Sequence, residues 1–346
     1  MNRLSSPDGI CASCGHDNRI RENSDAGLPF SLIAGKYLIG HALGRGGFGI
    51  TYVGMNRMIG KRVAVKEYFP AEIAERDPDG VNIRAVSREA EIQFEDGKQK
   101  ALEEARTVAR LQSVSNVVSI YDCFDCNNTV YIIMEFIEGE TFAAFSGRKG
   151  PVKWKDLWPM IRPVGTALGK LHRQNLVHRD ISPDNIMIRR DNGESVLLDF
   201  GAASGIVAEG QENRTALKDG YAAAEQYQSR AGINGRADEY SWCATVWYML
   251  TGSRPPNALQ RKAQQSDPEM PGRIRRRVPE PVRKALLKGM AVLQEDRYPC
   301  MEDLIRDLDC ADTSSAPRRK LLAALAILAL AVLLISLAVG LFGFLV

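Results

Sequence analysis

A short glycine-rich stretch restricts the fold more than any other feature of this sequence. Residues 44–49 read Gly-Arg-Gly-Gly-Phe-Gly and match the spacing G-x-G-x-x-G, which dinucleotide-binding folds and simple turns both use. A dinucleotide fold requires a helix after the last glycine, whereas residues 50–53, Ile-Thr-Tyr-Val, are β-branched and aromatic and predict a strand. The stretch is therefore expected to form a hairpin that can lay backbone N–H groups over phosphates, because glycine lacks a Cβ.

Apolar periodicity around this hairpin predicts a small sheet followed by a helical region. Alternating residues indicate strands over 37–43, 50–53, 62–68, 117–121 and 129–136. Helical spacing indicates one helix over 98–111 and a mainly helical stretch over 138–309. Residues 67–95 are interpreted as an insertion whose role the sequence does not reveal. The chain of 346 residues is long enough for two lobes, and an α+β fold is predicted.

The strand after the hairpin ends in a lysine. Residues 63–66 read Val-Ala-Val-Lys, and Lys66 follows Gly49 by 17 residues. A lysine on a strand is by default a solvated side chain. Glu104, on the predicted helix, offers a carboxylate that would orient Lys66 toward phosphates. Glu103 is the neighbouring alternative.

Two further motifs lie in the second half of the chain. Residues 178–185 read His-Arg-Asp-Ile-Ser-Pro-Asp-Asn, and residues 199–201 read Asp-Phe-Gly. With the glycine hairpin, Ala-x-Lys and the helix glutamate before them, these motifs stand in the order typical of one family. From about Gly40 to Leu308 the chain resembles the eukaryotic-type protein kinases. The resemblance implies a kinase domain over 36–310, with a β-rich N-lobe over 36–136 and a helical C-lobe over 137–310.

The resemblance also implies roles in phosphoryl transfer from ATP. Asp180 would accept the proton of the substrate hydroxyl, and Lys66, paired with Glu104, would contact the ATP phosphates. Asn185 and Asp199 would hold Mg²⁺, with Mn²⁺ as an alternative, because carboxylate and amide oxygens suit these ions. With Met134 as the gatekeeper, the residues implied to bind the nucleotide are Leu43, Gly44, Arg45, Gly46, Gly47, Phe48, Gly49, Ile50, Thr51, Ala64, Lys66, Met134, Glu135 and Ile137.

One pair of residues departs from the family pattern. Ser182 stands where the family usually carries a lysine that neutralises the transferred phosphoryl group, and Lys218 stands where the family usually has a threonine. We interpret this as an exchange, in which Lys218 supplies the charge and Ser182 the hydroxyl. A solvent-facing Lys218 is the alternative.

Several charged residues resemble the family's structural anchors. The segment ending at Tyr221-Ala-Ala-Ala-Glu225 resembles the end of an activation segment, with alanine at 224 where proline is usual. The resemblance implies that Glu225 pairs with a buried Arg297 and that Asp238 holds the backbone of the catalytic loop.

Arg179 suggests regulation by phosphorylation, because kinases of this type often order the activation segment by pairing this arginine with a phosphorylated residue. Thr215 is the first candidate and Ser204 the second. Unmodified hydroxyls in a solvated loop are the alternative.

The C-terminal residues 321–346 predict a membrane span. These 26 residues carry no charge, and as a helix they would extend about 39 Å against a hydrocarbon core of roughly 30 Å. The span is preceded by Arg318, Arg319 and Lys320. These positive charges would place the start of the span, and with it the kinase domain, on the cytoplasmic side. The membrane is expected to be a bacterial inner membrane. Residues 311–320 are interpreted as a linker. The alternative to a membrane span over 321–346 is an unusually apolar helix that mediates oligomerisation.

The N-terminal residues 1–35 are polar, lack the apolar region of a secretory signal, and contain Cys11-Ala-Ser-Cys14. This pair resembles half of a zinc ribbon, and Zn²⁺ would need further ligands, for which Cys123 and Cys126 are candidates. Reduced thiols without metal are the alternative expectation.

Composition limits the other partners. A formal net charge of +3 and a pI near 8.4 do not suggest nucleic-acid binding. Arg273, Arg275, Arg276 and Arg277 form the densest basic cluster, with a solvated face as the default and anionic lipid or an acidic substrate as alternatives. A dimer is the alternative to a monomeric chain.

These patterns together predict an ATP-dependent serine/threonine protein kinase, a phosphotransferase tethered to the cytoplasmic face of a membrane that acts on protein hydroxyls. The first alternative is a membrane-tethered pseudokinase that binds or scaffolds, and Ser182 is its only support in the sequence. The second is a kinase-fold enzyme with a small-molecule substrate. The peptide-binding platform implied by Glu225, Asp238 and Arg297 favours a protein substrate instead.

Overall fold

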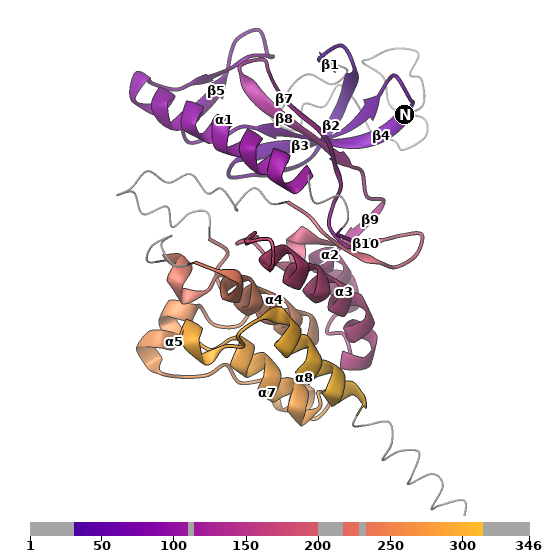
Figure 1. The fold of residues 1–346 in the computed structure, drawn as a ribbon, viewed down its shortest axis with the longest axis vertical. Helices are drawn as coiled ribbons and strands as arrows, with labels where there is room; N and C mark the ends of the chain where they lie inside the picture. Colours follow the sequence, from indigo (N-terminus) through magenta and orange to yellow (C-terminus); the bar gives the residue numbers. More distant parts are fainter. Residues whose placement is uncertain (1–30, 110–113, 200–216, 228–232, 314–346) are drawn as a thin grey trace, which may run out of the picture.

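The computed structural model describes residues 31–109, 114–199, 217–227 and 233–313, and these form two lobes (Figure 1). The N-lobe contains a six-stranded antiparallel sheet in the order β1-β2-β3-β4-β8-β7. Its strands are β1 (Leu32–Ile33), β2 (Tyr37–Gly46), β3 (Gly49–Asn56), β4 (Lys61–Tyr68), β7 (Ile120–Cys126) and β8 (Thr129–Glu135). Of the stretch predicted as a polar N-terminal segment, Leu32 and Ile33 therefore belong to the sheet.

The expected glycine hairpin is present. Strands β2 and β3 pair through Gly46 and Gly49, and Gly47 and Phe48 form the turn between them. A Cβ on Gly49 would collide with the Glu67 carbonyl oxygen, whereas a Cβ on Gly44, Gly46 or Gly47 would meet open space. Gly49 is therefore required for close strand packing, and the other three glycines leave their backbone accessible.

Helix α1 (Arg88–Ala109) lies against the sheet and begins ten residues before the predicted start at Lys98. The Ser87 hydroxyl accepts a hydrogen bond from the Ala90 N–H and so caps the helix. Phe94 and Gly97 are buried on it. The sequence obscured this first half because a glycine interrupts it and Ile92 is exposed.

The predicted insertion folds into regular structure. Residues 74–76 and 83–85 form a two-stranded antiparallel hairpin, β5 (Ala74–Arg76) and β6 (Ile83–Ala85), and α1 follows directly. Strand β7 also differs from its prediction, because it runs over 120–126 rather than 117–121. Asn127 and Asn128 both adopt positive φ and form the β7–β8 turn.

The C-lobe is mainly helical and packs around one apolar core (Figure 1). Helix α4 is central and buried on all sides, and Trp242 on it meets Trp158 of α3 edge to face, with ring centroids 6.4 Å apart. The helices are α2 (Phe142–Lys149), α3 (Trp154–His172), α4 (Gly235–Thr251), α5 (Ala258–Gln264), α6 (Gly272–Arg275), α7 (Glu280–Gly289) and α8 (Met301–Thr313).

A small sheet lies where the lobes meet. Its order is β11-β10-β9, with β9 (Gly139–Thr141), β10 (Ile186–Arg189) and β11 (Ser195–Leu197). Strands β10 and β11 follow the His-Arg-Asp motif and precede Asp199, so their pairing brings the two motifs to one edge.

Helix α8 extends to Thr313, three residues into the predicted linker, because Leu304, Leu308 and Ala311 continue its buried stripe. No helix among residues 31–313, so far as they are described, has the length and apolar character needed to cross a bilayer. The predicted span over 321–346 lies outside the described residues.

Candidate active site

The candidate active site lies between the lobes, where Lys66 of β4 reaches Asp199. The Lys66 ammonium donates a hydrogen bond to Asp199 Oδ1. Burial alone would lower the pKa of Lys66, but attraction to Asp199, Glu104 and Asp180 holds this pKa above its usual value. The lysine is therefore a charged group held among three carboxylates.

The direct partner of Lys66 differs from the prediction. The hydrogen bond goes to Asp199 and not to Glu104, although Glu104 acts on the lysine electrostatically. Glu103, the alternative, is exposed and accepts a hydrogen bond from Gln99, whereas Glu104 Oε1 is buried. The sequence pointed to a glutamate on this helix as the partner of Lys66. Spacing alone cannot decide whether that glutamate or Asp199 contacts the lysine directly.

Asp180 is held from two directions. Asn185 Nδ2 donates to the Asp180 carboxylate at 2.8 Å and to its backbone oxygen at 2.7 Å. Lys218 Nζ lies 3.1 Å from Asp180 Oδ2 and 3.0 Å from Ser182 Oγ. Ser182 is fully buried. The structure thus brings the two residues of the predicted exchange together beside Asp180, and the Lys218 ammonium contacts protein groups instead of only solvent.

The catalytic loop is suspended from Asp238, as its resemblance to a family anchor implied. Asp238 accepts hydrogen bonds from the backbone N–H groups of His178 and Arg179, both at 2.7 Å, and from His172 Nε2 at 2.8 Å. Burial alone would raise the pKa of Asp238, but these hydrogen bonds and the nearby histidines hold this pKa below its usual value. Asp238 is therefore a buried carboxylate that fixes the loop.

Two residues of the site adopt left-handed backbone conformations. The φ angles of Arg179 and Asp199 are 66° and 48°, values that residues other than glycine rarely adopt. His178 joins these two turns, because its Nε2 donates to Leu198 O at 2.8 Å and its Nδ1 accepts from the Asp180 N–H at 3.3 Å. The strain is held by this buried network.

The activation-segment anchor is also present. Arg297 is fully buried and forms a bidentate ion pair with Glu225, with N–O distances of 2.6 and 2.9 Å. Its remaining N–H groups donate to the carbonyl groups of Ala291, Arg236 and Val292. The expected pair is therefore confirmed. Thr215 and Ser204 lie outside the described residues.

Sequence reasoning missed two residues here. Gln226 donates to Arg179 O at 2.9 Å and accepts from the Ala223 N–H, so it ties the catalytic loop to the activation segment. His172 supports Asp238 from the end of α3. Neither belongs to a recognisable motif, and only the fold brings them to the site.

The strand register shows which face of the sheet several predicted nucleotide-binding residues share with Lys66, and it corrects one of them. Thr51 pairs with Lys66 in the β3–β4 register and so shares its face, whereas Ile50 pairs with Glu67 on the opposite face and is buried there. The Ile50 side chain therefore does not face the nucleotide side. Ala64 pairs with Met134 of β8, and Glu135 and Ile137 follow in the segment joining the lobes.

The donor set suits magnesium bound together with phosphates. Asp199 presents a carboxylate that is 41% exposed, and Asn185 donates to Asp180 through Nδ2, so its Oδ1 would be the atom that binds a metal ion. Magnesium commonly uses one or two protein oxygens and completes its shell with phosphates and water. For zinc, the described part of the chain contains no cluster of three or more candidate ligands, and Cys11 and Cys14 lie outside it.

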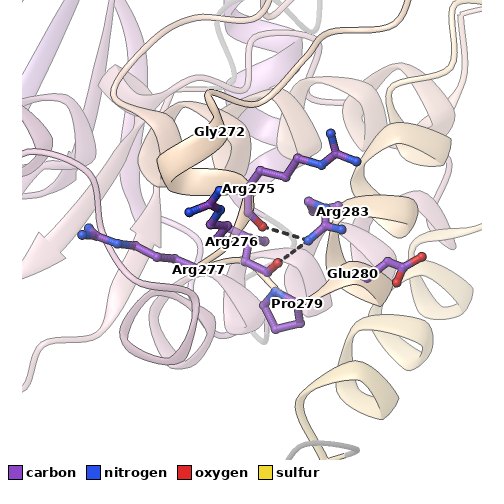
Figure 2. Close-up of a pocket in the computed structure, with 8 residues that line it drawn as sticks. Gly272, Arg275, Arg276, Arg277, Pro279, Glu280 and Arg283 are labelled. Atoms are coloured by element: carbon purple, nitrogen blue, oxygen red, sulfur yellow. Dashed lines mark hydrogen bonds between the residues drawn. The ribbon is translucent and has the colours of Figure 1, made fainter.

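A pocket lies in the C-lobe, apart from the residues of the candidate active site. It encloses about 610 Å³ between α6 and α7 and is lined by Gly272, Arg275, Arg276, Arg277, Val278, Pro279, Glu280 and Arg283 (Figure 2). Arg283 donates to the carbonyl groups of Arg275 and Val278. The side chains of Arg275 and Arg277 point in opposite directions, so these two arginines do not converge on one anion (Figure 2).

Comparison with known proteins agrees with this geometry. The family model described as protein kinase domain matches residues 37–302. The chain belongs to the protein kinase family.

Relatives and a solved structure support the assignment. The chain is 32% identical over 275 residues to serine/threonine-protein kinase Pkn1 of Myxococcus xanthus, covering 76% of this chain and 36% of Pkn1. It is 31% identical over 277 residues to PknE of Mycobacterium bovis, covering 78% and 45%. A solved structure titled PpkA-294 apo form superposes with a TM-score of 0.72 at 27% identity, covering 82% of this chain and all of that one. The chain thus spans less than half the length of these two relatives.

Proposed function

We propose that this kinase-family chain transfers the γ-phosphoryl group of ATP to serine or threonine hydroxyls of proteins. The observation that carries the proposal is the meeting of Lys66 from the N-lobe with Asp180, Asn185 and Asp199 from the C-lobe. The serine/threonine specificity is supported by the names of Pkn1 and PknE.

The side chains suggest a division of labour. The Asp180 carboxylate is oriented by Asn185 and Lys218. It accepts the proton of the substrate hydroxyl while the oxygen of that hydroxyl attacks the γ-phosphorus. The bond from this phosphorus to the β–γ bridging oxygen breaks, and ADP leaves. Lys66 contacts the ATP phosphates beneath the glycine hairpin. Magnesium, when bound at Asn185 and Asp199, neutralises phosphate charge.

Lys218 takes the place of the missing catalytic-loop lysine in this proposal. Its ammonium already contacts both Asp180 and Ser182, so it can stabilise the negative charge on the transferred group from the activation segment. The contact also weakens the pseudokinase alternative, because Ser182 was its only support. The charge required near the phosphoryl group is available from another residue.

We also propose that the kinase domain is tethered to the cytoplasmic face of a bacterial inner membrane by residues 321–346. The support is the sequence alone: 26 uncharged residues preceded by Arg318, Arg319 and Lys320.

Phosphorylation of a generic basic protein tests the proposed function. The purified full chain is incubated in detergent with labelled ATP and Mg²⁺, and the modified side chains are identified by mass spectrometry. We expect phosphoserine and phosphothreonine. Transfer to tyrosine alone would contradict the specificity, and transfer only to small molecules would favour the other kinase-fold alternative.

A further inference from the structure

Within the predicted insertion, the β5–β6 hairpin (residues 74–85) is attached to the active-site strand β4 by a buried ion pair. Arg76 of β5 binds the Glu67 carboxylate with both terminal nitrogens, at 2.5 and 3.2 Å. The side chains of Arg76 and Glu67 are only 6% and 2% exposed. A charge pair so deeply buried requires further hydrogen bonds to offset its desolvation.

Two buried tyrosines supply these hydrogen bonds. Tyr52 of β3 donates to Glu67 Oε2, and Tyr131 of β8 donates to Glu67 Oε1, both at 2.8 Å. Glu67 is thus the centre of a network that joins β3, β8 and the insertion hairpin. Each of the two strands that flank β4 therefore contributes one tyrosine hydroxyl to the Glu67 carboxylate, at the same distance.

Glu67 is next to Lys66 on β4, and their side chains point to opposite faces of the sheet. The Lys66 side chain contacts Asp199 of the C-lobe, whereas the Glu67 side chain contacts Arg76 of the β5–β6 hairpin. Fixing Glu67 therefore also fixes the strand position from which Lys66 extends.

The same region also holds the glycine hairpin. The Phe69 N–H donates to Phe48 O at the tip of the hairpin, at 2.9 Å. The guanidinium groups of Arg45, in the hairpin, and Arg76, in the insertion, both lie 5.4 Å from the ring centre of Phe69. Tyr52 is on the returning strand of this hairpin, three residues after Gly49.

Helix α1 is connected to the insertion as well. The Val86 N–H donates to Ile73 O at 3.0 Å, and Ser87 then caps α1. The Asn128 side chain donates to Ile83 O at 2.8 Å, which attaches β6 to the β7–β8 turn. The insertion thus contacts the hairpin, the lysine strand and the helix that carries Glu104.

We propose that Glu67 and Arg76 are positioning residues, through which the insertion holds the glycine hairpin and Lys66 in the arrangement that binds ATP. Tyr52 connects this pair to the hairpin. The inference rests on the proposed kinase function. A buried ion pair is weak evidence of added stability, but its directional hydrogen bonds favour one strand arrangement over others. This arrangement sets the affinity for the ATP phosphates.

The two tyrosines provide a matched test. Tyr52→Phe and Tyr131→Phe each remove one hydroxyl from the same carboxylate and leave the ring in place, but only Tyr52 belongs to the glycine hairpin. We expect Tyr52→Phe to raise KM for ATP about three- to tenfold with kcat nearly unchanged, because the hairpin binds ATP both before and during transfer. Tyr131→Phe should leave KM within about twofold.

Thermal unfolding of both variants separates positioning from stability. If the network serves only stability, both substitutions lower Tm and neither moves KM, and this result would overturn the inference. Equal increases of KM in both variants would overturn it too. Dissociation constants for ATP with Mg²⁺, measured by calorimetry, make the same comparison even if wild-type protein transfers no phosphate, which would contradict only the proposed function.

The ion pair has its own control within the insertion. Arg76→Ala leaves Glu67 buried without its cation, and KM for ATP should rise at least tenfold in protein that folds. Arg84→Ala removes another arginine side chain of the β5–β6 hairpin. The Arg84 side chain is 57% exposed and pairs with Glu75 and Asp77. This control should behave as wild type. Equal KM values for the two variants would contradict the role of Arg76.

Discussion

Around Asp180, the Lys218 ammonium and the Ser182 hydroxyl lie where the proposed exchange of family positions requires them. Lys218 reaches Asp180 and Ser182 from the activation segment, so its position depends on how that segment is folded. A lysine within the catalytic loop would carry no such dependence. The proposed exchange therefore makes the positive charge near Asp180 depend on the conformation of the activation segment.

The exchange predicts a specific pattern of rates. Lys218→Ala should lower kcat about a hundredfold, the size typical for loss of one group that stabilises transition-state charge. The double variant Ser182→Lys/Lys218→Thr restores the usual family arrangement and should recover most of this loss. Steady-state kinetics measures both. An unchanged kcat in Lys218→Ala, while Asp180→Ala abolishes activity, would show that the exchange is wrong.

Glu239, buried in α4, provides a pH-dependent contribution to stability. Burial raises its pKa to about 8, from an ordinary value of 4.5, while the Tyr298 N–H donates to its Oε1 at 3.0 Å. The folded state therefore binds this proton more tightly than the unfolded state does. Its contribution is full below about pH 4.5 and is lost as the pH rises through about 8.

Glu239→Gln should remove this pH dependence, because the amide keeps the acceptor for Tyr298 and cannot ionise. Within the window, the unfolding free energy of wild type should fall by up to about 1.4 kcal/mol per pH unit relative to the variant. Urea denaturation at pH 5 and pH 8.5 measures the difference. A constant difference between the two proteins at both pH values would contradict the assignment.

At the scale of elements, the activation segment is fixed to the C-lobe by the ion pair between Glu225 and Arg297. Arg297 is fully buried and donates to the Arg236 carbonyl at the start of α4 and to the Ala291 carbonyl after α7, so this guanidinium joins the segment to the core. Losing the carboxylate would leave a buried cation without its charge partner.

Glu225→Ala should therefore lower the unfolding free energy by about 3–5 kcal/mol. Glu295→Ala, two residues before Arg297 and on the surface, is the matched control and should change it by less than about 0.5 kcal/mol. Chemical denaturation of both variants provides the comparison. Similar losses in the two would show that the pair does not anchor the segment.

Element predictions succeeded where the pattern was local and strong. The glycine hairpin and the lysine strand follow from alternation and glycine spacing within a few residues, and the structure has both. The start of α1 could not be read in this way, because Gly97 interrupts the pattern. The hairpin over 74–85 was missed because its strands have three residues each, too few to show alternation.

The site shows the same division. Lys66, Asp180, Asn185 and Asp199 lie in short motifs that a sequence displays directly. The pairing of Lys66 with Asp199, the support from His172, and the network around Glu67 join residues that are far apart in sequence. These contacts depend on how helices and strands pack, which residue order alone does not specify.

For the whole molecule, the proposed membrane attachment lies outside the kinase domain. The proposed span over 321–346 follows α8 by a short polar stretch, and the match to the kinase family model ends before it, at residue 302. Full-length protein expressed in bacteria should sediment with membranes and resist extraction by alkaline carbonate. Residues 1–320 should remain in the supernatant. Full-length protein in the soluble fraction would contradict the tether.

The purpose that we propose for the two-lobed arrangement is to bring one carboxylate of the catalytic loop to a substrate hydroxyl beside ATP. Asp180 and Asp184 lie four residues apart in that loop, but only Asp180 is bound by Asn185 and Lys218, whereas Asp184 is exposed. The two aspartates therefore allow a matched comparison of the same substitution.

The most direct measurement is transfer of labelled phosphate from ATP to protein by purified full-length wild type, Asp180→Asn and Asp184→Asn. We expect wild type and Asp184→Asn to transfer phosphate at similar rates, and Asp180→Asn to be slower by at least about a hundredfold, because its amide cannot accept the proton. Equal transfer by wild type and Asp180→Asn, or none by a wild type that binds ATP with Mg²⁺, would contradict the account.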